Sequence, residues 1–284
     1  MWTGLTYAPF GRKQCHYSVL DGDPNGTMIW SDAHLTHEGV RQAREVKAFW
    51  RSQIDEQKMA TPQSFYVSPL DRTLRTAEET FADLDLGDPD RASQSNDDDK
   101  DRRRAYLPVV KELLRETMGI HTCDRRSTKS YIREHYPSYA IETSLTEADE
   151  LWLPDRRETN PVLTARLRRL LDDVVVHDSS TWISMTAHSG AIGALLRAVG
   201  HRPFQLQTGA VIPVLVRVEK ASETDGSGSG SGKTTDHQAV NDDEGRQDEW
   251  HTKPECRHDL DLGNIGWQRW GKGLKEFLEE IEGR

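Results

Sequence analysis

Hydrophobic and polar positions follow two different periods along this chain of 284 residues. Apolar residues that return every three or four positions are typical of helices, whereas short apolar runs bounded by turn residues are typical of buried strands. The first pattern predicts helices over residues 35–56, 70–81, 160–177, 191–200 and 270–282. The second pattern predicts strands over residues 64–68, 106–114, 181–188 and 209–219.

Strands and helices alternate through the middle of the chain. This order predicts an α/β fold, specifically a three-layer α/β/α domain with a mostly parallel central sheet. In such sheets ligands bind beyond the carboxyl ends of the strands. Candidate functional residues are therefore those that directly follow a strand.

Two segments show neither period. Residues 87–104 mix acidic and basic residues without an apolar stripe, and residues 221–256 combine a Gly-Ser repeat with more than half of the chain's net charge of −10. Both predict disordered surface inserts in a single domain that spans residues 1–284. The repeat before Lys233 is similar to a phosphate-binding loop, but Ser227 stands where that loop requires its first glycine and no apolar strand precedes it. Nucleotide binding is not expected there.

Composition narrows the class of protein. A net charge of −10 argues against a general nucleic-acid binder, and no apolar run approaches the 18 residues of a membrane span. The N-terminal residues lack the order of a signal peptide, and three cysteines cannot form a disulfide framework. These features predict a cytoplasmic protein without nucleic-acid or membrane partners.

Two places share one design, in which a buried strand leads through a tight turn with a basic residue into a helix. The strand at 64–68 is followed by Arg72, and the strand at 181–188 ends at His188, Ser189 and Gly190. The start of a helix offers free N–H groups and a partial positive charge, which suit a phosphate. A guanidinium adds a planar fork for two phosphate oxygens, and a histidine can donate to the same group.

Each candidate residue can also be explained by an ordinary structural role. Arg72 taken alone is typical of a surface salt-bridge partner, Glu116 of a surface carboxylate, and the pair Arg125 and Arg126 of a solvated turn. His121 and Cys123 lack a second pair at a spacing that suits a metal, and Cys256 and His258 do not supply one. We therefore expect no metal site.

Taken together, four segments occur in the order and at the separations of a known family. They are DAHLTHEGVRQA (32–43), SPLDRTLRT (68–76), LLRETMGIHTCDRRS (113–127) and TAHSGAIGALL (186–196). Over roughly residues 15 to 220 the chain resembles the histidine phosphatase superfamily, the phosphoglycerate mutase-like group, and especially its fungal branch.

The resemblance implies phosphoryl transfer through a phosphohistidine, with no metal or organic cofactor. In the family a histidine of an Arg-His-Gly motif attacks phosphorus, a second histidine and two arginines bind the phosphate, and an acid protonates the leaving oxygen. By position, Arg72 corresponds to a phosphate-binding arginine and His188 to the second histidine, which is both catalytic and phosphate-binding. Glu116 corresponds to the catalytic acid. Arg125 and Arg126 match a pair of arginines on the substrate side.

The sequence departs from the family pattern at the nucleophile, because no Arg-His-Gly occurs in its 284 residues. His16 is the nearest histidine but lacks the flanking Arg and Gly. We expect the first strand of the family sheet to be missing or replaced, with residues 3–10 as a poor substitute because Pro9 fits a sheet centre badly. A truncated reading frame explains this more simply than evolved loss.

The first hypothesis is a phosphomonoester phosphatase that acts on a small phosphorylated metabolite. Mutase activity is less favoured, since it requires a site that retains a bisphosphate intermediate. The alternatives are a catalytically inactive phosphate-binding pseudoenzyme or scaffold, and an interaction protein that docks through residues 221–256. The sequence names neither the substrate nor the oligomeric state.

Overall fold

A computed structural model describes residues 31–87, 105–204 and 209–218. Among these residues the helices are α1 (His37–Asp55), α2 (Asp71–Phe81), α3 (Lys129–His135), α4 (Asn160–His177) and α5 (Ser189–Ala198). The strands are β1 (Ser64–Val67), β2 (Pro108–Val110), β3 (Ala140–Ile141) and β4 (Ile183–Thr186). Two short 3₁₀ helices complete the set, η2 (Glu112–Leu114) and η3 (Thr122–Asp124).

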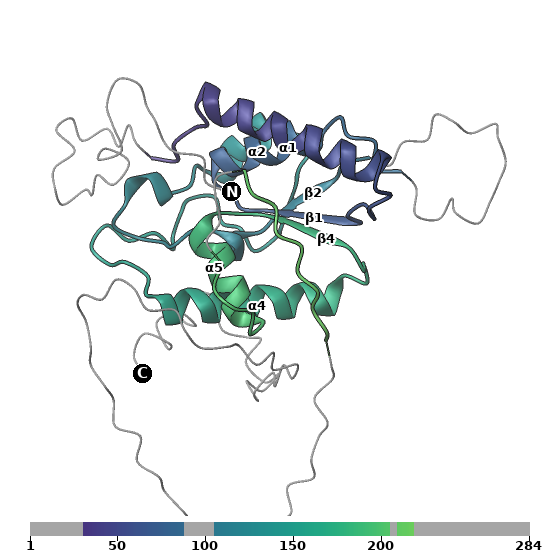
Figure 1. The fold of residues 1–284 in the computed structure, drawn as a ribbon. Coiled ribbons are helices and arrows are strands. Elements are labelled where there is room, and N and C mark those ends of the chain that lie inside the picture. Colours follow the sequence, from purple (N-terminus) through teal and green to yellow (C-terminus); the bar gives the residue numbers. More distant parts are fainter. Residues whose placement is uncertain (1–30, 88–104, 205–208, 219–284) are drawn as a thin grey trace, which may run out of the picture.

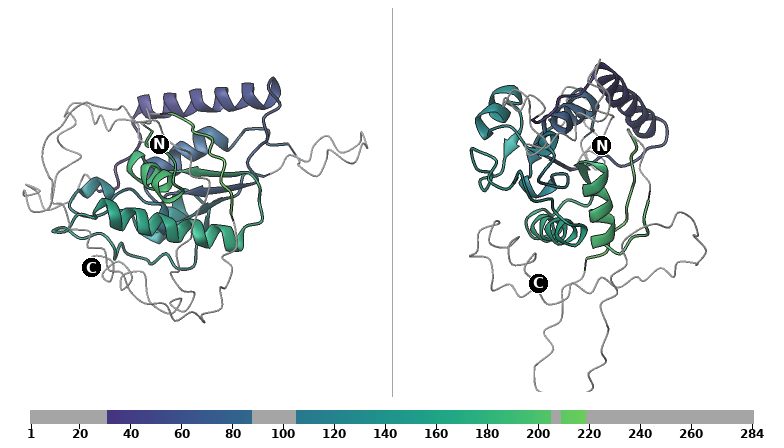
Figure 2. Two further views of the ribbon diagram at one scale, coloured as in Figure 1. Left: turned by 60° about the horizontal axis from the view of Figure 1, so that its bottom comes forward. Right: turned by 90° about the vertical axis from the view of Figure 1, so that its left-hand side faces the viewer.

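The four strands form one parallel sheet in the order β3-β2-β1-β4. Helices α1 and α2 pack together on one face, and α4 and α5 pack together on the other (Figure 1). The same three layers are visible in the side view of Figure 2. The predicted α/β architecture with a parallel sheet between helical layers is therefore confirmed.

Apolar side chains from the helices fill the space on both faces of the sheet. On the α4 and α5 side, Leu163, Leu167 and Leu170 pack with Tyr66 and Ala191. Their spacing of three and four residues puts them on one face of α4, which is the stripe that the sequence predicts. On the other face, the core contains Val46, Trp50, Phe65, Phe81, Leu84 and Leu86.

Local chemistry explains where the helices begin. The Thr36 side chain accepts a hydrogen bond from the Gly39 N–H and so caps α1. Pro161 stands in the first turn of α4, where a missing N–H costs nothing. At the other end of α5, Gly200 adopts φ 68°, a left-handed conformation that commonly terminates helices.

Several predicted strands are shorter in the structure, and one is wrong. Residues 209–218 form no strand, although their β-branched composition predicted one over 209–219. No described strand forms hydrogen bonds with these residues, so they lack the backbone pairing that a strand requires. Leu215 is fully exposed, so its side chain does not join the core. The run 106–114 divides into β2 and η2. Helix α3 and strand β3 were not predicted.

Other predictions lie outside the described residues. They include the helix over 270–282, the insert over 221–256, residues 88–104 of the other insert, and the residues before Ser31. The single-domain organisation over 1–284 stays a prediction. None of the helices in the part that the structure describes has the length and apolar content to cross a membrane.

Candidate active site

Three sequence-predicted residues meet at the carboxyl edge of the sheet. Arg72 lies in the first turn of α2 after β1, Glu116 follows β2 and η2, and His188 directly precedes α5 after β4. Because parallel strands end at the same edge, these positions converge. Two hydrogen bonds connect the three segments that carry them, one between Thr73 Oγ1 and His188 Nε2 at 2.8 Å and one from the Gly190 N–H to Glu116 Oε2 at 3.0 Å.

Arg72 is a buried residue whose guanidinium is anchored by the protein. Its Nη1 donates to the Cys123 carbonyl at 2.7 Å, and its Nη2 donates to Asp124 Oδ1 at 2.9 Å. The other oxygen of Asp124 accepts from Arg157 Nη1 at 2.9 Å. One carboxylate thus lies between two guanidinium groups. With 2% of Arg72 exposed, its interpretation as a surface salt-bridge partner is wrong.

His188 is fully buried at the start of α5. Burial lowers the pKa of its imidazole well below the ordinary value of 6.5, and the charges of Arg72, Arg115 and Arg166 lower it further. The ring is therefore neutral near pH 7. Its Nδ1 atom is buried and has no hydrogen-bond partner in the described residues. An anion bound there would give this buried atom a hydrogen-bond partner and would be stabilised by the positive field.

Glu116 reaches the start of α5 with its carboxylate. Oε2 accepts from the Gly190 N–H, while Oε1 accepts from the Thr117 N–H at 2.8 Å. A Cβ at position 190 would lie 2.0 Å from Oε1, so any larger residue would displace the Glu116 carboxylate from this position. The partial positive charge of the helix start thus holds Glu116 in place, and a phosphate would have to lie beside the carboxylate rather than at this position.

Arg166 holds the backbone that carries Glu116. This fully buried α4 side chain donates to the carbonyls of Leu113 at 2.7 Å, Arg115 at 3.1 Å and Glu116 at 3.1 Å. It also forms an ion pair with Glu158 at 2.7 Å. The turn between η2 and Glu116 is therefore fixed from the α4 layer.

The two predicted substrate-side arginines behave differently. Arg126 is buried, and its guanidinium donates to Glu112 Oε2 at 2.7 Å and to the Thr146 carbonyl at 2.9 Å. Neither a substrate contact nor a solvated turn fits this geometry, because protein oxygens already accept the hydrogen bonds of the Arg126 guanidinium. Arg125 lies over the Trp152 ring at 5.5 Å and is partly exposed, so it is the member of the pair that a substrate can reach.

Asp32 ties the entry loop of α1 to both arginine-bearing segments. Its Oδ1 accepts from the Asp71 N–H at 2.8 Å and its Oδ2 accepts from the Ser127 N–H at 2.8 Å. Burial raises the pKa of the Asp32 carboxyl. The neighbouring His34, which is largely exposed, contacts Asp71 Oδ2 through Nδ1 at 2.5 Å, and this bond raises the pKa of His34. His34 thus belongs to the support of α2.

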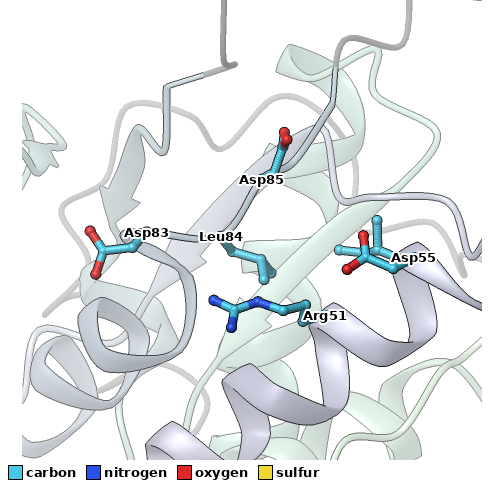
Figure 3. Close-up of a pocket in the computed structure, with 6 residues that line it drawn as sticks. Arg51, Asp55, Asp83, Leu84 and Asp85 are labelled. Atoms are coloured by element: carbon cyan, nitrogen blue, oxygen red, sulfur yellow. The ribbon is translucent and has the colours of Figure 1, made fainter.

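A surface pocket lies at the opposite end of α2 (Figure 3). Its lining residues are Arg51, Ile54, Asp55, Asp83, Leu84 and Asp85. Because α2 begins beside His188 and ends before this pocket, one helix length separates the two places, about 16 Å for 11 residues. The pocket therefore takes no part in the candidate site. In the described ranges, no group of three or more His, Cys, Asp or Glu side chains is placed to hold a metal ion.

Sequence reasoning missed three polar residues of this site, namely Thr73, Asp32 and Arg166. Thr73 follows Arg72 directly, and Asp32 begins the segment that contains His34. Their position next to motif residues could therefore have indicated both. Arg166 had none, because an arginine within an apolar helical stripe is normally assigned to the solvent side.

Comparison with known proteins agrees with this α/β architecture. The histidine phosphatase superfamily (branch 1) matches residues 23–93. "Probable phosphoglycerate mutase PMU1" of Saccharomyces cerevisiae is 32% identical over 73% of this chain and 71% of its own length. The chain therefore belongs to the histidine phosphatase superfamily, as its motifs indicate.

Two other fungal relatives are longer than the region they share with this chain. A "Probable phosphoglycerate mutase" of Arthroderma benhamiae is 48% identical over 73% of this chain and 57% of its own length. "Phosphomutase-like protein 3" of Candida albicans is 33% identical over 77% of this chain and 62% of its own length. The chain thus spans about three fifths of these relatives.

A solved structure of a mycobacterial glucosyl-3-phosphoglycerate phosphatase with inorganic phosphate is 22% identical. It covers 59% of this chain and 70% of its own, with a TM-score of 0.33. A likeness this weak adds nothing to the case for function. The family match over 23–93 contains Arg72 but assigns no role to it, and it does not reach Glu116 or His188, so the roles of all three residues stay predictions.

Proposed function

We propose that this protein is a phosphomonoester phosphatase that works through a phosphohistidine. Arg72 and His188 bind the phosphate, and Glu116 protonates the oxygen of the leaving group. Attack on phosphorus by a histidine breaks the ester bond while the leaving oxygen takes a proton, and water then releases inorganic phosphate. We assign no nucleophile among the described residues. Arg125 contacts the rest of the substrate.

The observation that carries this proposal is the environment of His188 Nδ1. This buried atom lacks a partner in the described part of the chain and lies in the field of three arginines. A phosphate oxygen supplies the hydrogen-bond partner that Nδ1 lacks among the described residues, and its negative charge suits the field of the arginines. Preorganised donors of this kind stabilise the charge that develops on a transferring phosphoryl group.

The substrate is a small phosphorylated metabolite. Relatives named as probable phosphoglycerate mutases make phosphoglycerates the first compounds to test. Phosphatase activity is favoured over mutase activity, and a cytoplasmic location without nucleic-acid or membrane partners stays a prediction.

Phosphorus NMR of the protein incubated with 3-phosphoglycerate tests the reaction class directly. We expect an inorganic phosphate signal that grows with time and is at least tenfold slower in His188→Ala. Growth of the 2-phospho isomer instead would establish a mutase. Equal phosphate release by wild type and His188→Ala would contradict the role of His188.

The role of Glu116 has a separate test. An acid matters only when the leaving oxygen is basic, so Glu116→Gln should slow hydrolysis of an alkyl phosphate by about 100-fold and hydrolysis of p-nitrophenyl phosphate far less. Gln keeps an acceptor for the Gly190 N–H. Equal losses on both substrates would overturn the assignment as acid.

A second candidate is a phosphate-binding protein without turnover. The burial of Arg72 and His188 supports it, because a buried basic site can bind an anion without a nucleophile. Phosphate binding that depends on Arg72, combined with no release of phosphate from any ester, would support this alternative over the phosphatase.

A further inference from the structure

A buried hydrogen bond connects α2 to the start of α5 inside the site. Thr73 Oγ1 lies 2.8 Å from His188 Nε2, and neither residue is exposed. Thr73 comes from the turn of α2 that also carries Arg72. The bond fixes the imidazole through one nitrogen, so the other nitrogen, Nδ1, lies on the side of the ring away from Thr73.

The direction of this bond follows from a count of hydrogens. A neutral imidazole has one N–H and a hydroxyl has one O–H, so either group can be the donor. If Nε2–H donates, both the hydroxyl hydrogen and the Nδ1 lone pair have no partner, because the described residues offer neither atom another bond. If the hydroxyl donates, only the Nδ1–H has no partner. The second arrangement leaves fewer buried polar groups unsatisfied.

We propose that Thr73 is a positioning residue that donates its hydroxyl hydrogen to His188 Nε2 and thereby holds the ring as the Nδ1–H tautomer. The inference rests on the proposed function in taking phosphate as the ligand of that N–H, whereas the tautomer itself is independent of any ligand. His188 then acts as a neutral donor toward a phosphate oxygen. In the reverse tautomer a lone pair would face the phosphate and repel it.

This arrangement makes anion binding independent of a proton on His188. Burial and the surrounding arginines disfavour the imidazolium form. Among the described residues, Thr73 contacts the ring, the charges of Arg72, Arg115 and Arg166 act on it, and the Glu116 carboxylate lies nearby at the Gly190 N–H. Sulfate has the shape of phosphate and does not titrate between pH 6 and 8. Its affinity should therefore stay within twofold across that range.

Nitrogen-15 NMR of histidine-labelled protein reads the tautomer without reference to activity. The His188 signals are identified by their absence in His188→Gln. We expect a protonated Nδ1 and an unprotonated Nε2 at pH 7.5, preserved in Thr73→Ser and altered in Thr73→Val. A wild-type protein with protonated Nε2, or with both nitrogens protonated, would overturn the proposal.

Phosphate affinity is the second readout, with Thr76→Val as the matched control. Thr76 lies on the same helix, is buried, and its hydroxyl donates to the Arg72 backbone carbonyl at 2.8 Å. We expect binding of inorganic phosphate to weaken tenfold or more in Thr73→Val and to stay within threefold in Thr73→Ser and Thr76→Val. Equal affinity in wild type and Thr73→Val would overturn the positioning role.

The two readouts separate this inference from the proposed function. An Nδ1–H tautomer in a protein that binds no phosphate supports Thr73 and contradicts the phosphatase. Phosphate release that depends on His188 but not on the Thr73 hydroxyl supports the phosphatase and contradicts the positioning role. Should Thr73→Val fail to fold, the wild-type and Thr73→Ser spectra still decide the tautomer.

Discussion

His188 combines complete burial with three nearby arginines, and this placement links the site to the pH dependence of stability. Its folded-state pKa lies below the unfolded value of about 6.5. Below that pH the His188 side chain binds a proton in the unfolded chain but not in the folded protein. Unfolding therefore becomes easier as the pH falls, whereas at pH 7.5 and above this residue makes no such contribution.

Replacement by a side chain that does not titrate should remove this dependence. Between pH 6.5 and 5 the free energy of unfolding of the wild type should fall more steeply than that of His188→Gln. The difference in slope should approach about 1.4 kcal/mol per pH unit, the limit for one proton. Urea unfolding at several pH values measures it, and carboxylates common to both proteins cancel. Parallel slopes would show that His188 is protonated in the folded state.

At the residue scale, Arg72 and His188 were predicted from their positions after strands and Glu116 from the family resemblance. The structure places all three at the carboxyl edge of the sheet, and their roles stay predictions. Arg126 shows the limit of this reasoning, because a sequence does not reveal that Glu112 and the Thr146 carbonyl surround its guanidinium. Burial of a charged side chain depends on partners that are distant in the chain.

At the scale of elements, the start of α2 depends on a residue from outside the helix. Leu70 occupies the capping position and has no side-chain bond, so Asp32 accepts from the Asp71 N–H in its place. Asp32 also adopts φ 47°, a left-handed conformation that Asp tolerates better than most residues. A remote carboxylate therefore holds the turn that carries Arg72.

Asp32→Ala should lower the free energy of unfolding by about 1–3 kcal/mol, because the N–H groups of Asp71 and Ser127 would lose their acceptor. It should also weaken phosphate binding several-fold, since Arg72 would be less firmly held. Thr36→Ala provides the control, because it removes the cap of α1, not of α2, at a cost of about 1 kcal/mol. Equal phosphate affinities in the two variants would show that Asp32 serves stability alone.

Helices were easier to predict than strand pairing. The periods over 35–56 and 160–177 gave α1 and α4 nearly to their ends, since a helix satisfies its own backbone. Residues 209–218 have the composition of a strand but no described partner. Helix α3 has seven residues, too few for a period to show, although its cap Thr128 was readable. Even within α1, Phe49 is 48% exposed, although the neighbouring Val46 and Trp50 are buried.

At the scale of the molecule, the parallel sheet gathers groups from segments far apart in the chain. The carboxyl ends of β1, β2 and β4 bring Arg72, Glu116 and His188 to one edge, and Arg166 supports that edge from the α4 layer. Alternating strands and helices predicted this convergence. The buried ion pairs that hold the edge in shape were not predictable, because each joins residues from different elements.

The central claim is that this edge binds phosphate through Arg72 and His188. Calorimetric titration of inorganic phosphate into wild type, Arg72→Ala and Arg75→Ala tests it most directly. Arg75 lies on the same helix, carries the same charge and pairs with Glu78 at 2.9 Å on a more exposed face. A charge-assisted bond contributes about 1.5–3 kcal/mol, so Arg72→Ala should bind tenfold or more weakly while Arg75→Ala stays within twofold. A wild-type protein that binds no phosphate, or equal losses in the two variants, would contradict the account.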